Sequence, residues 1–296
     1  MTGFKSITFE DKDILAKYLN VAKHRACDYS IGNLILWQKT YETSYIVVED
    51  FLIIKFSHGK DVYFSYPIGK GDTKVAIDWI LDYCKTENIE LCMNIVEPDM
   101  FEEMDKFYPG EFEIVYQRDN ADYIYHVEDL KNLSGKKYHG KKNHINKFLK
   151  VNEEWAYEAI TDANTLECIE MTKEWCIENG CCQDKSRAEE VCVMINGLMH
   201  RKELGFIGGI IRLSGKIIAI TMGEQSGEDM FIIHFEKAFV GIQGAYPMIN
   251  QQFIIHELTG YTYVNREEDM GVEGLRKAKE SYYPAFMAEK GIVTKK

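Results

Sequence analysis

Three apolar segments in the second half of the chain constrain the fold more than any other feature. They are rich in β-branched and aromatic residues, and only short turns separate them. The segments are residues 206–213, 216–223 and 230–235. A turn as short as Ser214-Gly215 predicts that they form an antiparallel meander. A helix and a further strand then follow, at residues 245–258 and 261–264.

The first half shows the same order of signals. Three strand patterns come first, followed by a helix and another strand. Their ranges are 45–48, 51–56, 62–66, 74–84 and 91–96. Each half therefore predicts antiparallel strands, a helix and a parallel strand, which is an internal repeat of architecture rather than of sequence. We expect an α+β fold whose mixed sheets are mostly antiparallel.

The charge is distributed unevenly along the chain. The net charge of −12 divides into −10 for residues 1–133, +6 for 134–150 and −8 for 151–296. The middle segment has six lysines and no carboxylate, so it is a candidate for binding phosphate groups. The alternative is a basic linker helix that forms salt bridges with the acidic domain on either side.

The sequence favours a cytoplasmic protein. Its start lacks the apolar core of a signal peptide, and no apolar run approaches the roughly 18 residues of a membrane span. Eight cysteines are scattered without a Cys-x-x-Cys pair, so we expect reduced thiols and no metal site.

The stretch 261–284 combines a strand, a charged turn and a helix. The turn holds Arg266, Glu267, Glu268 and Asp269, and Asp269 is a plausible N-cap for the helix. Sheets of α/β type place their sites at the carboxyl ends of strands, so this turn is a candidate site. The alternative is an ordinary surface helix with solvated charges.

Several side chains of this stretch could contact a substrate. Asn265, Glu267, Glu268 and Asp269 could hold a cationic amine, and Arg276 and Lys279 could face a phosphate or a carboxylate. Part of this charge could instead support the helix through i, i+4 pairs. Tyr282 or Tyr283 could protonate a leaving group, although tyrosines more often serve packing.

Two further features precede this stretch. Glu224 ends a predicted strand and could act as a general base, and Gly223 allows a bulge that would redirect it. We favour a solvated strand-end carboxylate for Glu224. Gly241 and Gly244 precede a helix, where main-chain N–H groups can receive a phosphate or carboxylate, unless the glycines only make the turn.

Two long motifs resemble one known family. Leu133-Ser-Gly-Lys-Lys-Tyr-His-Gly-Lys-Lys-Asn-His-Ile-Asn-Lys-Phe148 and Tyr263-Val-Asn-Arg-Glu-Glu-Asp-Met-Gly-Val-Glu-Gly-Leu-Arg-Lys-Ala-Lys279 are similar to the lysylphosphatidylglycerol synthase C-terminal domain family. The resemblance implies two tandem acetyltransferase-like (GNAT-like) domains, related to Fem-type aminoacyltransferases. We expect an N-terminal domain over 1–130, a basic linker helix over 131–150 and a C-terminal domain over 151–296.

The resemblance also implies an activity. Family members move an aminoacyl group from a charged tRNA to a lipid hydroxyl or an amine. We therefore expect a soluble aminoacyl- or acyltransferase with no tightly bound cofactor, and with aminoacyl-tRNA or acyl-CoA as co-substrate. Donor phosphates, including those of a tRNA partner, would meet Lys136, Lys137, Lys141 and Lys142. The acceptor would be a small molecule, a peptide or a lipid. The alternatives are an acyl-CoA-dependent N-acetyltransferase and a non-catalytic binding module.

Overall fold

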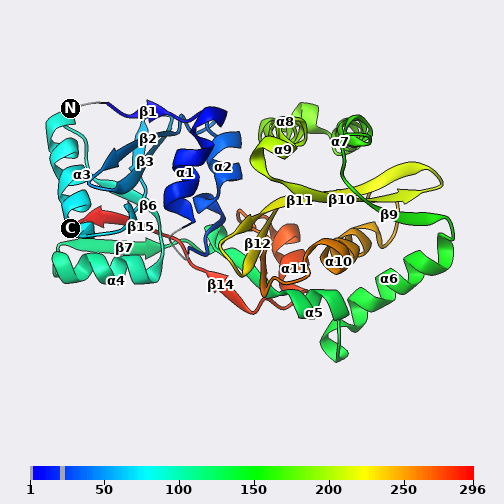
Figure 1. Ribbon diagram of the computed structural model, residues 1–296. Helices are drawn as coiled ribbons and strands as arrows, with labels where there is room; N and C mark the ends of the chain where they lie inside the picture. Colours follow the sequence, from blue (N-terminus) through cyan, green and yellow to red (C-terminus); the bar gives the residue numbers. More distant parts are fainter. Residues whose placement is uncertain (1–2, 21–23) are drawn as a thin grey trace. The chain divides into compact units, whose positions relative to one another are not determined.

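The computed structural model describes residues 3–20 and 24–296, apart from the side chains of His58 and Cys182, and divides into two compact units (Figure 1). Unit 1 contains Met1–Asp122, Glu268–Glu273 and Met287–Lys296, and unit 2 contains Tyr123–Glu267 and Gly274–Phe286. The expected boundaries at 130 and 150 differ from this division. Residues 123–150 belong to unit 2, and the C-terminal segment belongs to unit 1.

Unit 1 is built on a mixed sheet. Its strands are β1 (Lys5–Ser6), β2 (Ser44–Val48), β3 (Phe51–His58), β4 (Asp61–Phe64), β5 (Ile68–Gly69), β6 (Cys92–Val96), β7 (Phe112–Tyr116) and β15 (Gly291–Lys295). Its helices are η1 (Phe9–Asp11), α1 (Lys12–Leu19), η2 (Cys27–Tyr29), α2 (Ile31–Leu36), α3 (Thr73–Glu87), α4 (Pro98–Phe107) and η3 (Arg118–Asn120). The strand order is β1-β2-β3-β4-β6-β15-β7, with β5 paired to β3.

Unit 2 has the second mixed sheet, in the order β14-β8-β13-β12-β11-β10-β9. Its strands are β8 (Asp122–His126), β9 (Trp155–Ala159), β10 (Ile207–Leu213), β11 (Lys216–Ser226), β12 (Met230–Ala238), β13 (Tyr263–Asn265) and β14 (Phe286–Ala288). Its helices are α5 (Val127–Asn132), η4 (Lys136–Tyr138), α6 (His139–Val151), α7 (Thr165–Glu178), η5 (Cys181–Gln183), α8 (Lys185–Met199), α9 (Arg201–Leu204), α10 (Ala245–Glu257) and α11 (Glu273–Glu280).

The expected repeat of architecture is confirmed. In unit 1 the antiparallel strands β2, β3 and β4 are followed by α3 and by β6, which runs parallel to β4. In unit 2 the antiparallel strands β10, β11 and β12 are followed by α10 and by β13, which runs parallel to β12. Both halves thus have an α+β fold with a mixed sheet.

Each sheet also contains a strand from the other half of the chain. In unit 1, β15 pairs with both β6 and β7. In unit 2, β8 pairs with β13, next to β14. The unit boundaries therefore cannot follow the chain order, and a division at residues 130 and 150 would remove one strand from each sheet.

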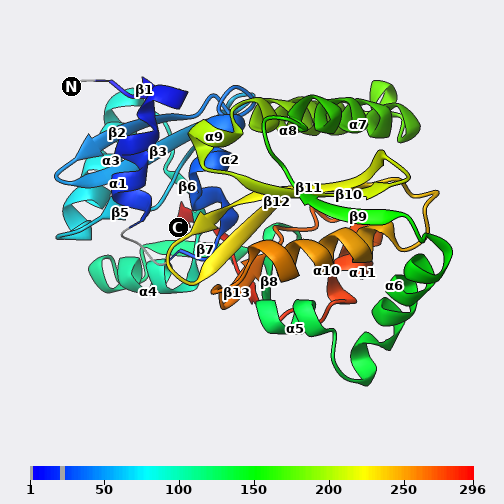
Figure 2. The same cartoon turned by 45° about the vertical axis from the view of Figure 1, so that its right-hand side comes forward.

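Helices cover both faces of the sheet in unit 2. Figure 2 shows α10 on one face and α7 with α8 on the other. Strands between two helical layers are buried on both faces and read as continuous apolar runs. This accounts for the burial of nearly all of β11 and β12.

The basic segment forms helices, as expected, but these helices pack as part of unit 2. Tyr138, Ile145 and Phe148 are buried, and α6 contacts α10. Gly244 precedes α10 with a φ of 89°, and a Cβ atom there would lie 2.5 Å from the carbonyl oxygen of His144. Gly244 is therefore explained by its positive φ and by the close approach of α6.

The turn before α11 differs from the prediction. The helix begins at Glu273, and Asp269 is not its N-cap. Instead the Asp269 carboxylate accepts a hydrogen bond from the Gly271 main chain at 2.9 Å, which forms a turn ahead of the helix. Pro284 follows the end of α11, and Tyr283 has a φ of 54° where the chain turns toward β14.

A bulge lies beside Gly223, as expected, but its extra residue is on the partner strand. Met222 lies opposite Phe235 and Gly223 opposite Ile233, so His234 of β12 is the additional residue, and Glu224 lies opposite Ile232. A Cβ atom on Gly223 would lie 1.8 Å from the carbonyl oxygen of Ile232, so only glycine fits this position.

We predict that Gly223→Ala destabilises the protein by about 1–3 kcal/mol, because the main chain of β12 must move to admit the methyl group. Urea unfolding monitored by circular dichroism measures the change. Gly241→Ala is the matched control, since a Cβ atom there meets nothing within 4 Å. Equal stability of the two variants would contradict the prediction.

Candidate functional site

The main feature of unit 2 is the divergence of its two central parallel strands. β12 and β13 pair only where Met230, Phe231 and Ile232 face Tyr263, Val264 and Asn265. β12 then continues to Ala238, whereas the segment that follows β13 turns away at Glu267, whose φ is 57°. The Asn265 side chain accepts a hydrogen bond from the Glu267 main chain at 2.6 Å and holds this turn. Side chains, rather than main-chain bonds, therefore connect the two segments beyond Ile232.

One of these connections is a buried histidine between two carboxylates. His234 Nε2 lies 3.0 Å from Glu224 Oε1, and its Nδ1 lies 2.8 Å from Glu267 Oε1. The exposed fraction is 1% for the His234 side chain, 6% for Glu224 and 22% for Glu267. We call these residues the acidic trio. Glu267 is its most exposed member and so the one that a substrate can contact.

The electrostatics of the acidic trio follow from its burial. Burial alone would lower the pKa of His234, but hydrogen bonds to Glu224 and Glu267, together with their charges, raise it to about 9. His234 is therefore an imidazolium at neutral pH. With both carboxylates ionised, the trio carries one net negative charge, which favours a cationic group near Glu267.

The expectation that Glu224 is solvated was wrong. β11 extends to Ser226, so Glu224 lies within the strand opposite Ile232 of the central strand β12, and its exposure is 4%. Sequence reasoning also missed His234. The signal that could have indicated it is a single histidine within the apolar segment Met230–Phe235.

A second polar group involves Glu236, two residues after His234 on β12. Glu236 Oε1 accepts a hydrogen bond from Arg266 Nη2 at 2.8 Å, and its Oε2 accepts one from Asn250 Nδ2 at 3.0 Å. Lys141 Nζ lies 3.9 Å from the centroid of the Tyr282 ring, and the Arg266 guanidinium lies 4.8 Å from the same centroid. We call Lys141, Glu236, Asn250, Arg266 and Tyr282 the basic group. The pKa of Lys141 is lowered to about 8, mainly by burial and to a smaller extent by the Arg266 charge.

Lys279 positions the turn that carries Arg266 and Glu267. The residue is 9% exposed, and its ammonium donates to the main-chain oxygens of Arg266 at 2.6 Å and Glu267 at 3.0 Å. Its own carbonyl accepts from the Tyr125 hydroxyl at 2.8 Å. Lys279 thus holds the main chain of the turn in place. Arg276, the other candidate cation of helix α11, is half-buried.

The two candidate tyrosines differ in their surroundings. Tyr282 is buried, and burial raises the pKa of its hydroxyl while the Arg266 charge opposes the shift. Tyr283 is 48% exposed and packs against the Tyr138 ring, with Lys137 Nζ 5.5 Å from its own ring centroid. The structure therefore brings Tyr282, but not Tyr283, into the basic group.

The candidate phosphate-binding residues also differ in their exposure to solvent. Lys136, Lys137 and Lys142 are exposed on η4 and α6, whereas Lys141 is partly buried in the basic group. Gly241 is exposed on the turn before α10. Lys136, Lys137 and Lys142 face solvent, and Lys137 pairs with Asp129 at 3.6 Å, whereas Lys141 lies over the Tyr282 ring.

The other two acidic residues of the turn belong to unit 1. The Asp269 carboxylate is fully buried and accepts from Arg118 Nη1 at 3.2 Å. Glu268 Oε2 lies 3.5 Å from the ammonium of Lys290. The structure therefore does not bring Glu267, Glu268 and Asp269 together around one amine, because protein cations already bind the last two.

Lys290 is the centre of a buried ionic cluster in unit 1. Its ammonium lies 2.6 Å from Asp28 and 2.8 Å from Asp122, and their charges raise its pKa although burial opposes this. Within the described residues, the ligand atoms of Cys27, Asp122 and Glu268 lie within 4.8 Å of one another, as metal ligands would. Lys290 already supplies the positive charge there. The seven cysteines with described side chains are free thiols.

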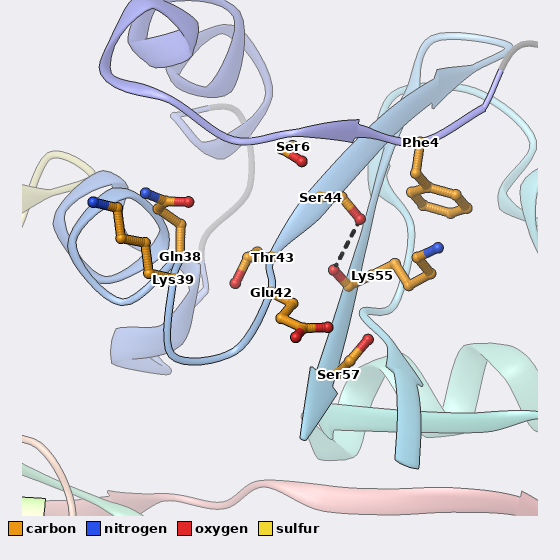
Figure 3. Close-up of a pocket in the computed structure, with 9 residues that line it drawn as sticks. All are labelled: Phe4, Ser6, Gln38, Lys39, Glu42, Thr43, Ser44, Lys55 and Ser57. Carbon is orange, nitrogen blue, oxygen red and sulfur yellow. Dashed lines mark hydrogen bonds between the residues drawn. The ribbon is translucent and has the colours of Figure 1, made fainter. Parts of the chain in front are cut away.

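Unit 1 also has an open groove of about 530 Å³ (Figure 3). Its lining includes the hydroxyls of Ser6, Ser44 and Ser57 and the ammonium of Lys55. Figure 3 shows Lys55 beside Phe4, whose ring centroid lies 4.5 Å from Nζ. None of the predicted site residues lines this groove, and it shares no residue with the acidic trio or the basic group.

Solved structures define the fold class. The chain is similar over 98% of its length to a tandem GNAT protein from the clavulanic acid biosynthesis pathway, at 8% identity, with 97% of that chain covered and a TM-score of 0.50. It is similar over its full length to L-PGS from Bacillus licheniformis, at 14% identity, with 94% of that chain covered and a TM-score of 0.68. The fold is that of two tandem GNAT-like domains.

The family follows from the sequence match. Residues 19–291 match the family model described as "Phosphatidylglycerol lysyltransferase, C-terminal", and the chain belongs to this family. A conserved protein of unknown function from Bacteroides thetaiotaomicron is 38% identical, with 100% of both chains covered and a TM-score of 0.95. An uncharacterised protein of Mycoplasmoides gallisepticum is 25% identical over 62% of this chain, and the match spans 58% of that protein's length.

Family and fold support an acyltransferase-type function. No helix in the described part of the chain has both the length and the apolar character needed to cross a membrane.

We predict that His234 makes stability depend on pH. Because its folded pKa of about 9 lies above the ordinary 6.5, its contribution is fully present below pH 6.5 and is lost as pH rises through 9. The loss is on the order of 3 kcal/mol at most. Urea unfolding across this range should show that the stability difference between wild type and His234→Gln shrinks as pH rises. The exposed His126→Gln is the control, and a difference that grows with pH would contradict the prediction.

We also predict that Lys290→Met destabilises unit 1 by about 3–5 kcal/mol, because it leaves buried carboxylates without their cation. Lys295→Met, at the exposed end of β15, should have little effect. Urea unfolding of both variants tests this, and a stable Lys290→Met protein would contradict it.

Proposed function

We propose that unit 2 transfers an aminoacyl or acyl group from an activated donor to an amine or hydroxyl acceptor. The observation that carries this proposal is the acidic trio at the divergence of β12 and β13. A nucleophile that reaches Glu267 meets a carboxylate held in place by a buried imidazolium. Such a group can orient the nucleophile and take its proton.

The reaction needs no covalent enzyme intermediate. The acceptor nitrogen or oxygen forms a bond to the acyl carbon of the donor, and the bond from that carbon to the donor oxygen or sulfur breaks. The proton leaves the nucleophile toward Glu267, and the departing oxygen or sulfur takes a proton from solvent. Arg266, next to Glu267 in the chain, and Lys141 supply positive charge in the basic group, which can attract an anionic donor.

The exposed lysines favour an aminoacyl-tRNA as donor. Lys136, Lys137 and Lys142 lie on consecutive elements, η4 and α6, in the only strongly basic segment of an acidic protein. Basic side chains grouped in this way neutralise backbone phosphates. The alternative donor is acyl-CoA, which the GNAT-like fold also favours, with Gly241 in the turn that precedes α10.

The donor prediction is tested by filter binding with charged and uncharged tRNA at two salt concentrations. We expect binding that weakens with salt, and a triple Lys→Glu variant at positions 136, 137 and 142 should lower the salt slope by roughly one unit per lost contact. Lys150→Glu, also exposed on α6, is a comparison at the far end of the helix. Binding that is absent at low salt, or unchanged in the triple variant, would rule out tRNA.

Transfer itself is tested with labelled aminoacyl-tRNA and labelled acyl-CoA against a panel of amines and alcohols. We expect Glu267→Gln to reduce the rate by about 10²-fold or more, as for loss of a general base. His126→Gln is the control for an exposed residue outside the trio. A stable Glu267→Gln protein with full activity would refute the role of the acidic trio, and no transfer from either donor would leave a binding module as the function.

A further inference from the structure

Lys141 differs from Lys237 and Lys279, the two buried lysines of unit 2, in its contacts. Lys237 Nζ lies 2.6 Å from Glu190 Oε1, and Lys279 Nζ donates to two main-chain oxygens. Lys141 Nζ forms no hydrogen bond or ion pair with any residue that the structure describes. It lies instead 3.9 Å from the centroid of the Tyr282 ring. This amine has therefore lost part of its hydration without gaining a carboxylate partner.

A second cation lies at the same ring. The Arg266 guanidinium is 4.8 Å from the same centroid. The Glu236 carboxylate of this group is bonded to Arg266 Nη2 at 2.8 Å and to Asn250 Nδ2 at 3.0 Å. Two neighbouring cations disfavour each other's charge, and a guanidinium does not lose its proton in proteins. Lys141 is therefore the group that loses a proton, and its pKa of about 8 agrees with this, although the Glu236 charge opposes the shift.

Solvent reaches the amine of Lys141. Arg266 Nη1 and Asn250 Oδ1 are buried atoms without a hydrogen-bond partner among the described residues, but Lys141 Nζ is not one of them, and Lys141 is partly exposed. A reagent can therefore contact Lys141 Nζ without entering the buried part of the basic group. Near pH 7 about a tenth of this lysine is an unprotonated amine, which is the nucleophilic form.

We propose that Lys141 is a nucleophilic lysine whose Nζ is acylated by activated esters and thioesters. A partly desolvated lysine amine beside a second cation is an arrangement by which proteins make lysine a nucleophile. This modification site goes beyond the proposed function and does not depend on it, because the acyl group is transferred to the protein itself rather than to an acceptor.

The step is a simple acyl transfer. The unprotonated Nζ attacks the acyl carbon and forms a C–N bond, and the bond from that carbon to the ester oxygen or thioester sulfur breaks. The nitrogen loses one proton to the departing group or to solvent. The product is an uncharged amide, so Lys141 loses its cation–π contact with Tyr282, and only the charges of the Glu236–Arg266 pair remain at this ring.

Acylation of the full chain with N-hydroxysuccinimidyl acetate or with acetyl-CoA, in separate arms, tests the proposal. Peptides from a protease that does not cleave at lysine are quantified by mass spectrometry over a range of pH. Near pH 7 we expect Lys141 to react about tenfold or more faster than the exposed Lys142 beside it, because about a tenth of Lys141 is unprotonated. The rate at Lys141 should reach half of its maximum near pH 8.

Lys55 is the matched control within the same protein. It is also half-buried, and its Nζ lies 4.5 Å from the Phe4 ring centroid, but no arginine of the described residues contacts that ring. Lys55 should therefore react more slowly than Lys141. Arg266→Gln removes the neighbouring cation and leaves Glu236 to favour the ammonium, so it should slow acylation of Lys141 near pH 7 about tenfold. The wild-type pH profile keeps the test valid if Arg266→Gln does not fold.

Three results would each overturn the proposal. They are acylation of Lys141 no faster than that of Lys55 and Lys142, a rate without a midpoint near pH 8, and a rate unchanged in a folded Arg266→Gln variant. Selective acylation by the ester but not by acetyl-CoA would overturn the thioester half and confine the site to esters. Selective acylation by both reagents would support the proposal whether or not the protein transfers a group to an acceptor, so failure of the proposed function stays distinguishable.

Discussion

The divergence of β12 and β13 is the constraint on which the rest of unit 2 depends. Two parallel strands that separate leave main-chain groups without ladder partners, and such groups must be paired in another way when they are buried. Lys279 provides part of this pairing by donating to the carbonyls of Arg266 and Glu267. The side chains of His234 and Glu236 then join the separated segments. The divergence thus separates the two strands and leaves ionised side chains to connect them.

The neighbouring strand β8 fixes the far side of this turn. The Tyr123 main chain donates to the Glu267 carbonyl at 3.2 Å and accepts from the Arg266 N–H at 3.0 Å. β8 comes from the first half of the chain, so the architecture that places the polar groups requires a strand far away in sequence. A rigid scaffold of this kind keeps catalytic groups oriented without reorganisation during the reaction.

Local patterns predicted the repeated elements, because meanders, helices and short turns are encoded by neighbouring residues. The meander over 206–235, helix α10 and the bulge at Gly223 are of this kind. Local patterns could not predict the position of β15 in the sheet of unit 1, because its partners β6 and β7 lie almost two hundred residues earlier. The expected domain boundaries differ from the two units for the same reason. His234 was missed because its two partners, Glu224 and Glu267, come from two other segments of the chain.

The turn at Glu267 shows most clearly why residue type alone could not define the site. Glu267, Glu268 and Asp269 look equivalent in sequence, yet their carboxylates have different partners, namely His234, Lys290 and Arg118. The positive φ of Glu267 turns the chain at this point, so consecutive side chains do not simply alternate as they would in a strand. Of the three, only Glu267 remains with the acidic trio. In the proposed site, a cationic substrate would therefore meet one carboxylate, which the buried His234 holds in place, rather than three carboxylates together.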